Sequence, residues 1–302
     1  MNYPIEVEGL TKKFQDLTAI NNLSFYVKRG EIFGIVGPDG SGKSTLIKLI
    51  AGILKPDEGE IRFFDINSFK ETKRIKSRIG YLSQNFSHYV DLTVEENLEF
   101  FAEVHRVKNF KERFEFLLDF SKLRPFRKTL ISNLSGGMKQ KLALISSLIY
   151  DPELLLLDEP TTGVDPISRR EFWLLLNQLV SKGKTIIFAT PYLDEAERFH
   201  KVLMLNKGEM LCCDTPEKII SSFEYLVAEV VCSNLELSKE LLSEFGDVQI
   251  FGDRLNLISS KSNPNFLEKA KDKLLKNGID LISCELINPS LENVFFYLLK
   301  NK

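Results

Sequence analysis

A glycine-rich segment at residues 37–45, GPDGSGKST, constrains the fold of this chain more than any other feature of the sequence. It matches the pattern G-x-x-x-x-G-K-[ST], a phosphate-binding loop that needs a strand before it and a helix after it. The apolar run Glu31–Val36 precedes the loop, and the helical segment IKLIAGIL follows it. These flanks argue against a chance match in a glycine-rich turn, so we predict a strand, a phosphate loop and a helix in succession.

The residue types in this loop suit the binding of a nucleoside triphosphate. Glycines let the backbone curl so that its N–H groups point at phosphate oxygens, and the helix N-terminus adds partial positive charge. We expect Lys43 to contact the β- and γ-phosphates and Ser44 to ligate Mg²⁺. The residues assigned here to nucleotide binding are Gly37, Pro38, Asp39, Gly40, Ser41, Gly42, Lys43, Ser44 and Thr45.

Two acids end the apolar run at residues 154–159, LLLLDE. On its own such a run is more often a plain strand end, but together with the upstream loop it predicts a catalytic strand edge. We expect Asp158 to lie beside the metal, usually through water. Glu159 is then placed to orient or deprotonate the attacking water.

Apolar runs alternate with amphipathic stretches through most of the chain, which predicts an α/β fold. Residues 154–157 and 185–189 are apolar throughout, as expected for a parallel sheet covered on both faces. The predicted strands are Ile5–Gly9, Leu23–Val27, Glu31–Val36, Glu60–Phe64, Ile79–Leu82, Leu154–Asp158, Thr185–Ala189 and Val202–Leu205. The predicted helices begin at Lys43, Val94, Gly137, Ile167 and Leu193.

The pattern changes near Ser221, and we predict two domains, residues 1–221 and 222–302. The second has the element order βαββαβ, which resembles a small ferredoxin-like module, followed by one more helix. Its predicted elements are a strand from Tyr225, helix Leu237–Phe245, hairpin Val248–Ile258, helix Pro264–Lys276, strand Ile279–Leu286 and helix Ser290–Leu299.

The composition excludes several classes of protein. With 302 residues, 43% hydrophobic and 27% charged, the chain is neither disordered nor collagen-like nor a coiled coil. Its longest stretch without Asp, Glu, Lys or Arg, residues 79–90, is too short and too polar for a membrane helix. The start, MNYPIEVEGL, lacks the basic and apolar regions of a secretory signal, so we expect folding in the cytosol.

Charge and cysteine content narrow the expected ligands. Residues 222–302 carry 9 basic and 12 acidic side chains, which leaves 31 basic and 30 acidic ones in the rest of the chain. Neither part has the basic excess of a nucleic-acid binder. The four cysteines show no CxxC spacing, which argues against a zinc site or a disulfide framework.

A further motif, LSGGMKQ at residues 134–140, lies between the phosphate loop and the paired acids. With GPDGSGKST, Gln84 and LLLLDEP it makes the chain resemble the nucleotide-binding subunit of an ATP-binding cassette (ABC) transporter, over residues 4 to about 220. The resemblance implies a P-loop NTPase cassette with a mostly parallel core sheet, an antiparallel β subdomain and a helical subdomain at about residues 93–147. Residues 222–302 then form a small α+β C-terminal module.

The resemblance also implies a role for each residue that matches a family motif. Phe14 stands where the family stacks an aromatic ring on adenine, although a core position is the alternative. Gln84 matches the loop that touches Mg²⁺ and senses the membrane subunit, which adds it to Lys43 and Glu159 as a catalytic residue. The signature residues Ser135, Gly136 and Gly137 match those that contact the γ-phosphate of the ATP bound to the opposite subunit. The loop residues Gly163, Val164 and Asp165 match those that cross the dimer interface, and Asp165 is assigned to nucleotide binding with the signature.

The signature segment makes physical sense as a second anion cradle. Ser135 starts a helix, and the two glycines after it allow close backbone approach. ATP would then lie between two helix N-termini from two chains, and hydrolysis would separate them.

One position departs from the family pattern. The family has a histidine that contacts the γ-phosphate after the strand that follows the interface loop. Here TIIFAT is followed by Pro191, and residues 192–197, YLDEAE, match the family's continuation. Proline has no side-chain donor and no N–H, so it cannot perform that role. Asp39 is a lesser departure, because Asn is commoner there and an acid near triphosphate is mildly unfavourable unless it faces away.

Two hypotheses follow from Pro191. In the first, Glu159 and the metal ligands still support hydrolysis, slowly or with altered coupling. In the second, the site is degenerate and the chain is a nucleotide-binding regulatory subunit beside a competent partner.

The end of the chain, NPSLENVFFYLL at residues 288–299, resembles the tail of exporter ATPases whose membrane subunit is a separate polypeptide. A generic amphipathic helix is the alternative. The resemblance implies ATP and Mg²⁺ as cofactors, a membrane permease and a second copy or paralogous cassette as partners, and a peripheral place on the cytoplasmic face of the membrane. The implied cargo is a drug, lipid, polysaccharide or other hydrophobic compound.

Two soluble ABC classes are rivals to the transporter interpretation. DNA-repair and chromosome ATPases usually split the two nucleotide motifs with a long coiled coil, whereas here about 110 residues without sustained heptads separate them. Translation factors of this class need two cassettes and basic ribosome-binding segments.

Overall fold

The computed structural model describes residues 3–64, 66–67, 75–84, 88–261, 263 and 265–301. It divides into two compact units, Met1–Cys213 and Asp214–Lys302. This division falls eight residues before the boundary that the sequence predicts after Ser221. The reason is helix α8 (Pro216–Ser221), which packs on the last helix, α11 (Leu291–Asn301), inside the second unit.

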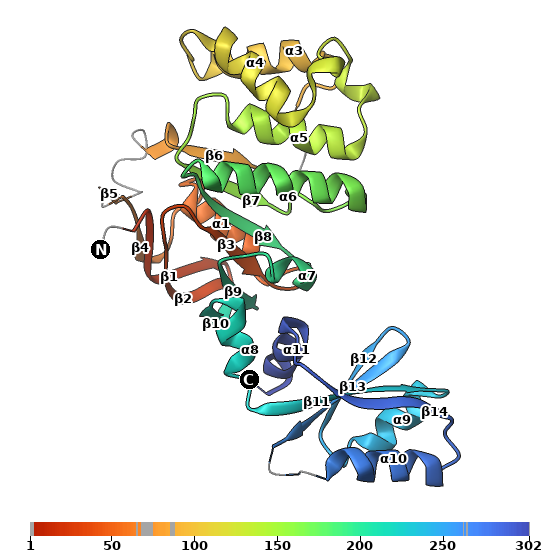
Figure 1. Cartoon of the computed structure of the whole chain (residues 1–302). Coiled ribbons are helices and arrows are strands. Elements are labelled where there is room, and N and C mark those ends of the chain that lie inside the picture. The colour runs from red at the N-terminus through yellow and green to blue at the C-terminus, as the bar shows by residue number, and fades with distance from the viewer. Residues whose placement is uncertain are drawn as a thin grey trace. The chain divides into compact units, whose positions relative to one another are not determined.

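A six-stranded sheet forms the centre of the first unit (Figure 1), with the strand order β10-β9-β3-β8-β7-β6. Its strands are β3 (Ile32–Val36), β6 (Ile79–Leu82), β7 (Leu154–Asp158), β8 (Thr185–Thr190), β9 (Lys201–Asn206) and β10 (Glu209–Asp214). Strands β3, β7 and β8 are buried along their whole length, and their pairs are parallel. The predicted α/β fold with a buried parallel sheet is therefore confirmed.

The register of this sheet brings the nucleotide motifs to one edge. Val36 aligns with Thr190, and Asp158 aligns with Ala189, so the carboxyl ends of β3, β7 and β8 lie side by side. Helix α1 (Lys43–Ile50) packs on β7 and β8, and helix α6 (Pro166–Ser181) also packs on β8. Helix α7 (Leu193–Ala196) follows β8 and packs on β3.

An antiparallel sheet with the order β2-β1-β4-β5 confirms the predicted β subdomain. Its strands are β1 (Ile5–Phe14), β2 (Leu17–Val27), β4 (Glu58–Phe63) and β5 (Ile66–Asn67). Apolar residues of β1, β2 and β4 share one core with α1, which ties this sheet to the central one. The β1–β2 turn, where Phe14 pairs with Leu17, thereby comes close to the phosphate loop.

Helices α3 (Val94–Val104), α4 (Phe110–Ser121) and α5 (Gly136–Ser147) form the helical part (Figure 1), with two 3₁₀ turns, Arg124–Phe126 and Ile131–Asn133. A capping box starts α3, because Thr93 accepts from the Glu96 N–H and the Glu96 carboxylate accepts from the Thr93 N–H. Helix α5 begins at Gly136, one residue before the predicted start.

The second unit contains an antiparallel sheet with the order β12-β13-β11-β14. Its elements after α8 are β11 (Tyr225–Cys232), α9 (Leu235–Leu242), β12 (Asp247–Phe251), β13 (Arg254–Ser260), α10 (Phe266–Lys276), β14 (Leu281–Ile287) and α11. The predicted βαββαβ order is therefore present, and α9 and α10 share a core with the sheet. The predicted helix start at Pro264 lies outside the described residues.

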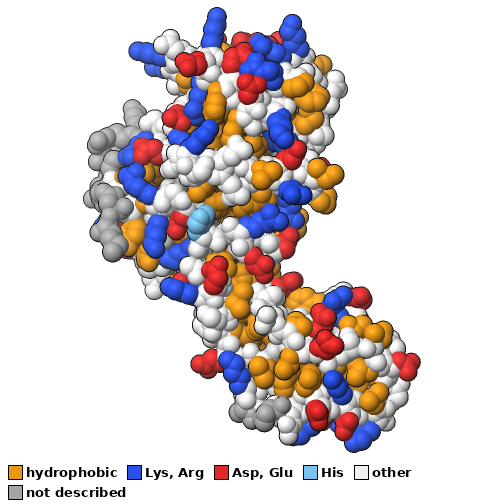
Figure 2. Space-filling model, in the orientation of Figure 1, with side chains coloured by type: hydrophobic (Ala, Val, Ile, Leu, Met, Phe, Trp, Pro, Cys, Tyr) orange, Lys and Arg blue, Asp and Glu red, His pale blue; other side chains and the backbone are white. Residues whose placement is uncertain are grey.

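Two surface properties bear on possible partners. Within the described part of the chain, no helix combines the length and the apolar character that crossing a bilayer requires. On the face shown in Figure 2, Lys and Arg side chains are interspersed with Asp and Glu. This face therefore agrees with the balanced charge of the sequence.

Candidate nucleotide-binding site

The phosphate loop joins β3 to α1 and depends on glycine at several positions. Gly40 and Gly42 have φ angles of 77° and 106°, a region that L side chains rarely adopt. A Cβ on Gly37 would lie 2.1 Å from the carbonyl oxygen of Leu205, and one on Gly42 would lie 2.6 Å from that of Ala19. The backbone thus curls in a space that only glycine fits, as the motif predicts.

The Lys43 side chain is almost fully buried and folds back over its own loop. Its ammonium donates to the carbonyl oxygens of Gly37 at 2.9 Å and Pro38 at 3.1 Å. It also lies 3.3 Å from the carboxylate of Glu159, which is buried too. This buried cation is therefore paired with a buried carboxylate.

The Asp39 side chain is 93% exposed to solvent. Its carboxylate lies 3.9 Å from the Lys43 ammonium. Asp39 also lines the cleft beside the phosphate loop, so its carboxylate does not face away from the proposed phosphate position.

Ser44 and Asp158 form an oxygen pair at the end of β7. The Ser44 hydroxyl donates to the buried Asp158 carboxylate at 2.9 Å. Burial raises the pKa of Asp158, and the charge of Glu159 raises it further. A hydroxyl and a desolvated carboxylate are the hard oxygen donors that Mg²⁺ prefers, so these residues fit a magnesium ion.

Glu159 follows β7 in a left-handed backbone conformation, with a φ of 51°. Its N–H donates to the carbonyl oxygen of Ala189 at 2.9 Å, which holds it against β8. Gln84, just after β6, donates from its side-chain amide to the Glu159 carboxylate at 3.0 Å. The structure thus brings together the three residues assigned to catalysis: Lys43, Gln84 and Glu159.

A cleft of about 690 Å³ runs from the phosphate loop to the β1–β2 turn. Phe14 lines it with 43% of its surface exposed, so the alternative of a core position for Phe14 is wrong. Lys207, in the turn between β9 and β10, also lines the cleft, although it belongs to none of the sequence motifs. Its neighbour Gly208 donates to the carbonyl oxygen of Ser41, which attaches this turn to the phosphate loop.

The signature and the interface loop do not line this cleft. Ser135 caps α5 by accepting from the Met138 N–H at 3.3 Å, and Asp165 caps α6 in the same way. Gly137 packs against α6, because a Cβ there would lie 2.3 Å from the Ser168 side chain. Within one chain, Ser135, Gly136, Gly137 and Asp165 are therefore separate from the residues that surround the phosphate loop.

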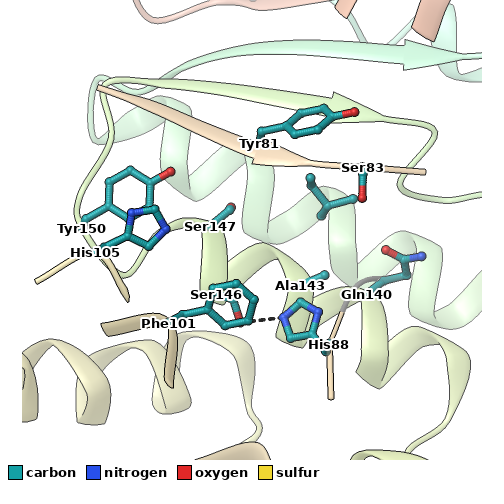
Figure 3. A pocket seen from close by; sticks show the side chains of 11 residues that line it. Tyr81, Ser83, His88, Phe101, His105, Gln140, Ala143, Ser146, Ser147 and Tyr150 are labelled. Atoms are coloured by element: carbon teal, nitrogen blue, oxygen red, sulfur yellow. Dashed lines mark hydrogen bonds between the residues drawn. The ribbon is translucent and has the colours of Figure 1, made fainter. Parts of the chain in front are cut away.

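A second, smaller pocket lies between β6, α3 and α5 (Figure 3). His88 Nε2 and the Ser146 hydroxyl are 2.8 Å apart, and Ser146 donates to the carbonyl oxygen of Leu142. His88 Nε2 must then carry the proton and donate to Ser146. Through this bond His88 packs against α5, and burial lowers its pKa to about 4. His105, in the same pocket, stacks on Tyr150 with 4.1 Å between ring centroids.

Pro191 follows β8 where the family has its histidine. The buried Thr190 before it accepts from the Tyr192 N–H at 3.1 Å. The three histidines lie elsewhere: His88 and His105 in the second pocket, and His200 with its Nδ1 accepting from the Ile32 N–H. The described residues that line the cleft therefore offer no histidine to replace the missing one.

Comparison with known proteins agrees with this geometry. The family described as ABC transporter matches residues 20–162. The probable multidrug ABC transporter ATP-binding protein YbhF of Escherichia coli (strain K12) is 37% identical, over 98% of this chain and 52% of that protein. The chain thus spans about half the length of that relative. The Nod factor export ATP-binding protein I of Bradyrhizobium diazoefficiens is 34% identical, over 84% of this chain and 85% of that protein.

Solved structures give the same result. A nucleotide-free ATP-binding cassette from an ABC transporter matches with a TM-score of 0.67 and 25% identity, covering 73% of this chain and 94% of the cassette. The cbiO1 protein of Clostridium perfringens, part of the ABC transporter complex cbiONQ, matches with a TM-score of 0.66 and 28% identity, covering 74% and 92%. Both confirm the cassette fold.

The burial of His88 predicts a pH-dependent stability. Its folded-state pKa lies below the value of about 6.5 in an unfolded chain, so the unfolded state binds a proton first as the pH falls. When the pH falls from about 7 to about 5, we expect the free energy of unfolding to decrease in both proteins. The decrease should be about 1–2 kcal/mol smaller in His88→Gln than in the wild type. Urea unfolding followed by the fluorescence of Trp173, the single tryptophan, measures this difference. Equal losses in both proteins would contradict the burial of a neutral imidazole.

Proposed function

Because this chain belongs to the ATP-binding subunits of ABC transporters, we propose that it hydrolyses ATP as a dimer and powers export through a separate membrane permease. The family implies ATP as the ligand and ATPase activity. The observation that carries the proposal is the convergence of Lys43, Ser44, Asp158 and Glu159 at one sheet edge. A phosphate binder, a pair of metal ligands and a general base are what hydrolysis of a triphosphate requires.

ATP binding would exchange the partners of Lys43. The triphosphate lies along residues 37–45, and its β- and γ-oxygens replace Glu159 as the anions nearest the ammonium. Phe14 stacks on adenine at the exposed β1–β2 turn. Ser44, Asp158 and Gln84 would hold Mg²⁺, which supplies neutralisation of the phosphate charge.

Glu159 acts as the general base in this proposal. Its carboxylate, no longer paired with Lys43, accepts a proton from the attacking water. The water oxygen bonds to the γ-phosphorus, the bond from that phosphorus to the β–γ bridging oxygen breaks, and ADP leaves with the electron pair. Gln84 orients the carboxylate through the hydrogen bond at 3.0 Å.

The second half of the ATP site would come from another cassette, either a second copy or a paralogue. The support is that Ser135, Gly136, Gly137 and Asp165 do not line the cleft of their own chain. The N-terminus of α5, with Ser135 as its cap, is an anion-binding end that a partner's nucleotide can use. ATP then joins the two chains, and hydrolysis releases them.

A permease is the proposed membrane partner, which places the chain at the cytoplasmic face of the membrane. The relatives named for multidrug and Nod factor export support an exporter of drugs, lipids, polysaccharides or other hydrophobic cargo. His88, which lines the pocket in Figure 3, and the exposed Tyr89 follow Gln84 along the chain and are the proposed contact that senses the permease. We assign residues 222–302 to an accessory domain that stabilises the dimer or contacts the permease.

Pro191 supports a second candidate, a regulatory subunit with weak or no turnover. It offers no donor to the γ-phosphate, and the cleft offers no histidine among its described lining residues. We favour hydrolysis because the proposed base and the metal ligands are all in place.

Replacing Glu159 by Gln tests hydrolysis. We expect a loss in kcat of about 100-fold or more, because a general base contributes about 10²–10⁴ in rate. ATP binding should be retained, since Lys43 keeps its two carbonyl partners in the loop. Phosphate release and equilibrium binding of ATP measure the two effects. Glu153→Gln, at an acid paired with Arg78 outside the cleft, is the control. Equal rates for Glu159→Gln and wild type would favour the regulatory subunit.

Replacing Pro191 by His tests the missing switch. We expect a higher kcat, because the imidazole restores a donor near the γ-phosphate. Pro191→Ala is the matched control, since it removes the ring without supplying a donor. The measurement is the steady-state ATPase rate of the wild type, Pro191→His and Pro191→Ala. Turnover by Pro191→His no faster than wild type would argue against an impaired switch.

Affinity purification from detergent-solubilised native membranes tests the partner. We expect a stoichiometric multi-span membrane protein to accompany the tagged chain and to be missing from the untagged control. Identification of the eluted proteins also shows whether a paralogous cassette is present. Recovery only from the soluble fraction, with DNA-repair proteins or ribosomes, would exclude the transporter proposal and leave the assignment to ATP intact.

A further inference from the structure

Glu195, on the short helix α7, is a fully buried carboxylate that lies outside the nucleotide cleft. A buried charge of this kind is costly to desolvate, and well-packed apolar residues often stabilise a fold as much or more. Its presence therefore needs an explanation other than packing.

Four side chains donate hydrogen bonds to this carboxylate. Oε1 accepts from the Thr161 hydroxyl at 2.9 Å, Arg169 Nε at 2.8 Å and Trp173 Nε1 at 3.1 Å. Oε2 accepts from the Thr190 hydroxyl at 2.6 Å. All four partners are donors, so the carboxylate serves only as an acceptor, as an ionised carboxylate does.

Thr161 connects this carboxylate to the proposed general base. It lies two residues after Glu159, and its carbonyl oxygen accepts from the Val164 N–H at 3.2 Å. Between them, Thr162 donates its N–H to the Glu159 carbonyl oxygen and its hydroxyl to the Glu159 carboxylate, at 3.3 and 3.4 Å. Fixing Thr161 therefore fixes the turn that leads from Glu159 to Asp165.

Thr190 connects the same carboxylate to the phosphate loop. Its carbonyl oxygen accepts from the N–H of Gly37 at 3.4 Å. The preceding residue, Ala189, accepts from the N–H of Glu159. Because Pro191 has neither an N–H nor a side-chain donor, the Thr190 hydroxyl is what anchors this strand end to Glu195.

The other two donors come from α6, the helix that Asp165 caps. Arg169 supplies the compensating charge and also bonds to the exposed Asp194 at the surface. Trp173 adds a neutral donor from one turn further along α6. Three segments thus meet at one carboxylate: the turn after Glu159, the end of β8 and the first half of α6.

We propose that Glu195 is a positioning residue for ATP hydrolysis: through Thr161 and Thr190 it holds Glu159 and residues 161–165 in place relative to the phosphate loop. This inference rests on the proposed role of Glu159 as the base. Glu195 touches neither nucleotide nor metal in this arrangement, so its effect is on the geometry of the base and not on ATP binding.

The test compares Glu195→Gln with Asp194→Asn in the full chain. Both remove a carboxylate that bonds to Arg169, but only the first changes the buried bonds to Thr161 and Thr190. We expect Glu195→Gln to lower kcat about tenfold or more, since small misplacements of catalytic groups cost up to about 10² in rate. The KM for ATP and the molar amount of ATP bound should stay within about twofold of wild type. Asp194→Asn should match the wild type in all three.

Hydrogen exchange in the nucleotide-free chain gives a readout that does not depend on hydrolysis. The amides of Glu159 and Val164 are hydrogen-bonded at the two ends of the turn that Thr161 anchors. We expect peptides covering residues 159–165 to exchange faster in Glu195→Gln and at the wild-type rate in Asp194→Asn.

Variants of Thr161 keep the proposal testable where Glu195→Gln does not fold. Thr161→Ser retains the hydroxyl that donates to Glu195, whereas Thr161→Val replaces it with a methyl group of similar volume. We expect the serine variant to stay near wild-type kcat and the valine variant to lose activity as Glu195→Gln does. Equal kcat for the serine and valine variants would overturn the positioning role.

Two further outcomes separate this inference from the proposed function. Wild-type kcat and unchanged exchange in a folded Glu195→Gln would overturn the role of Glu195 while leaving hydrolysis by this chain intact. A loss of kcat matched by an equal loss of bound ATP would also overturn it, since that indicates a smaller folded fraction. If wild type and Glu159→Gln hydrolyse ATP equally, the proposed function fails, and the exchange of residues 159–165 still decides whether Glu195 holds that turn.

Discussion

The buried ammonium of Lys43 is the constraint on which the rest of the site depends. A cation this deep needs anionic or carbonyl partners on every open side, and the structure supplies the carbonyl oxygens of Gly37 and Pro38 and the carboxylate of Glu159. To supply them, the loop must curl tightly after β3, and β7 must end beside it. The parallel register that aligns Val36 with Thr190 and Asp158 with Ala189 meets both needs.

Much of this fold could be predicted from the sequence, because the central strands are short, apolar and clearly bounded. The ranges of β6 and β7 match their predictions residue by residue. Strands β1 and β2 extend well beyond theirs, because polar residues such as Lys12 and Lys13 pair across an exposed hairpin. Helix α4 is not among the predicted helices. It begins at Phe110 after Asn109, a residue type that often caps helices, but here Asn109 has a positive φ and its side chain makes no capping hydrogen bond.

Some contacts of the site can also be predicted from neighbouring residues in the sequence, whereas others depend on residues that are far apart. The phosphate loop and the paired acids are contiguous motifs, and their chemistry can be read from adjacent residues. The bond between Gln84 and Glu159, and the place of Lys207 in the cleft, arise only when distant segments pack together. The hydrogen bonds of Glu195 could not be predicted from the local sequence, since its four donors lie 5 to 34 positions away in the chain.

The ion pairs Lys43–Glu159 and Arg169–Glu195 differ in how firmly their carboxylates are held. Lys43 and Glu159 lie 3.3 Å apart, and the Glu159 carboxylate also accepts hydrogen bonds from Gln84 at 3.0 Å and Thr162 at 3.4 Å, so an incoming phosphate can take its place beside Lys43. The Glu195 carboxylate, which pairs with Arg169, also accepts from Thr161, Thr190 and Trp173, and it lies outside the nucleotide cleft. The Lys43–Glu159 pair can therefore exchange partners while the Arg169–Glu195 pair stays in place. In the proposed mechanism, a γ-phosphate that displaces Glu159 from Lys43 would redirect its carboxylate without shifting the backbone that carries it, because Glu195 holds the turn after Glu159 through Thr161.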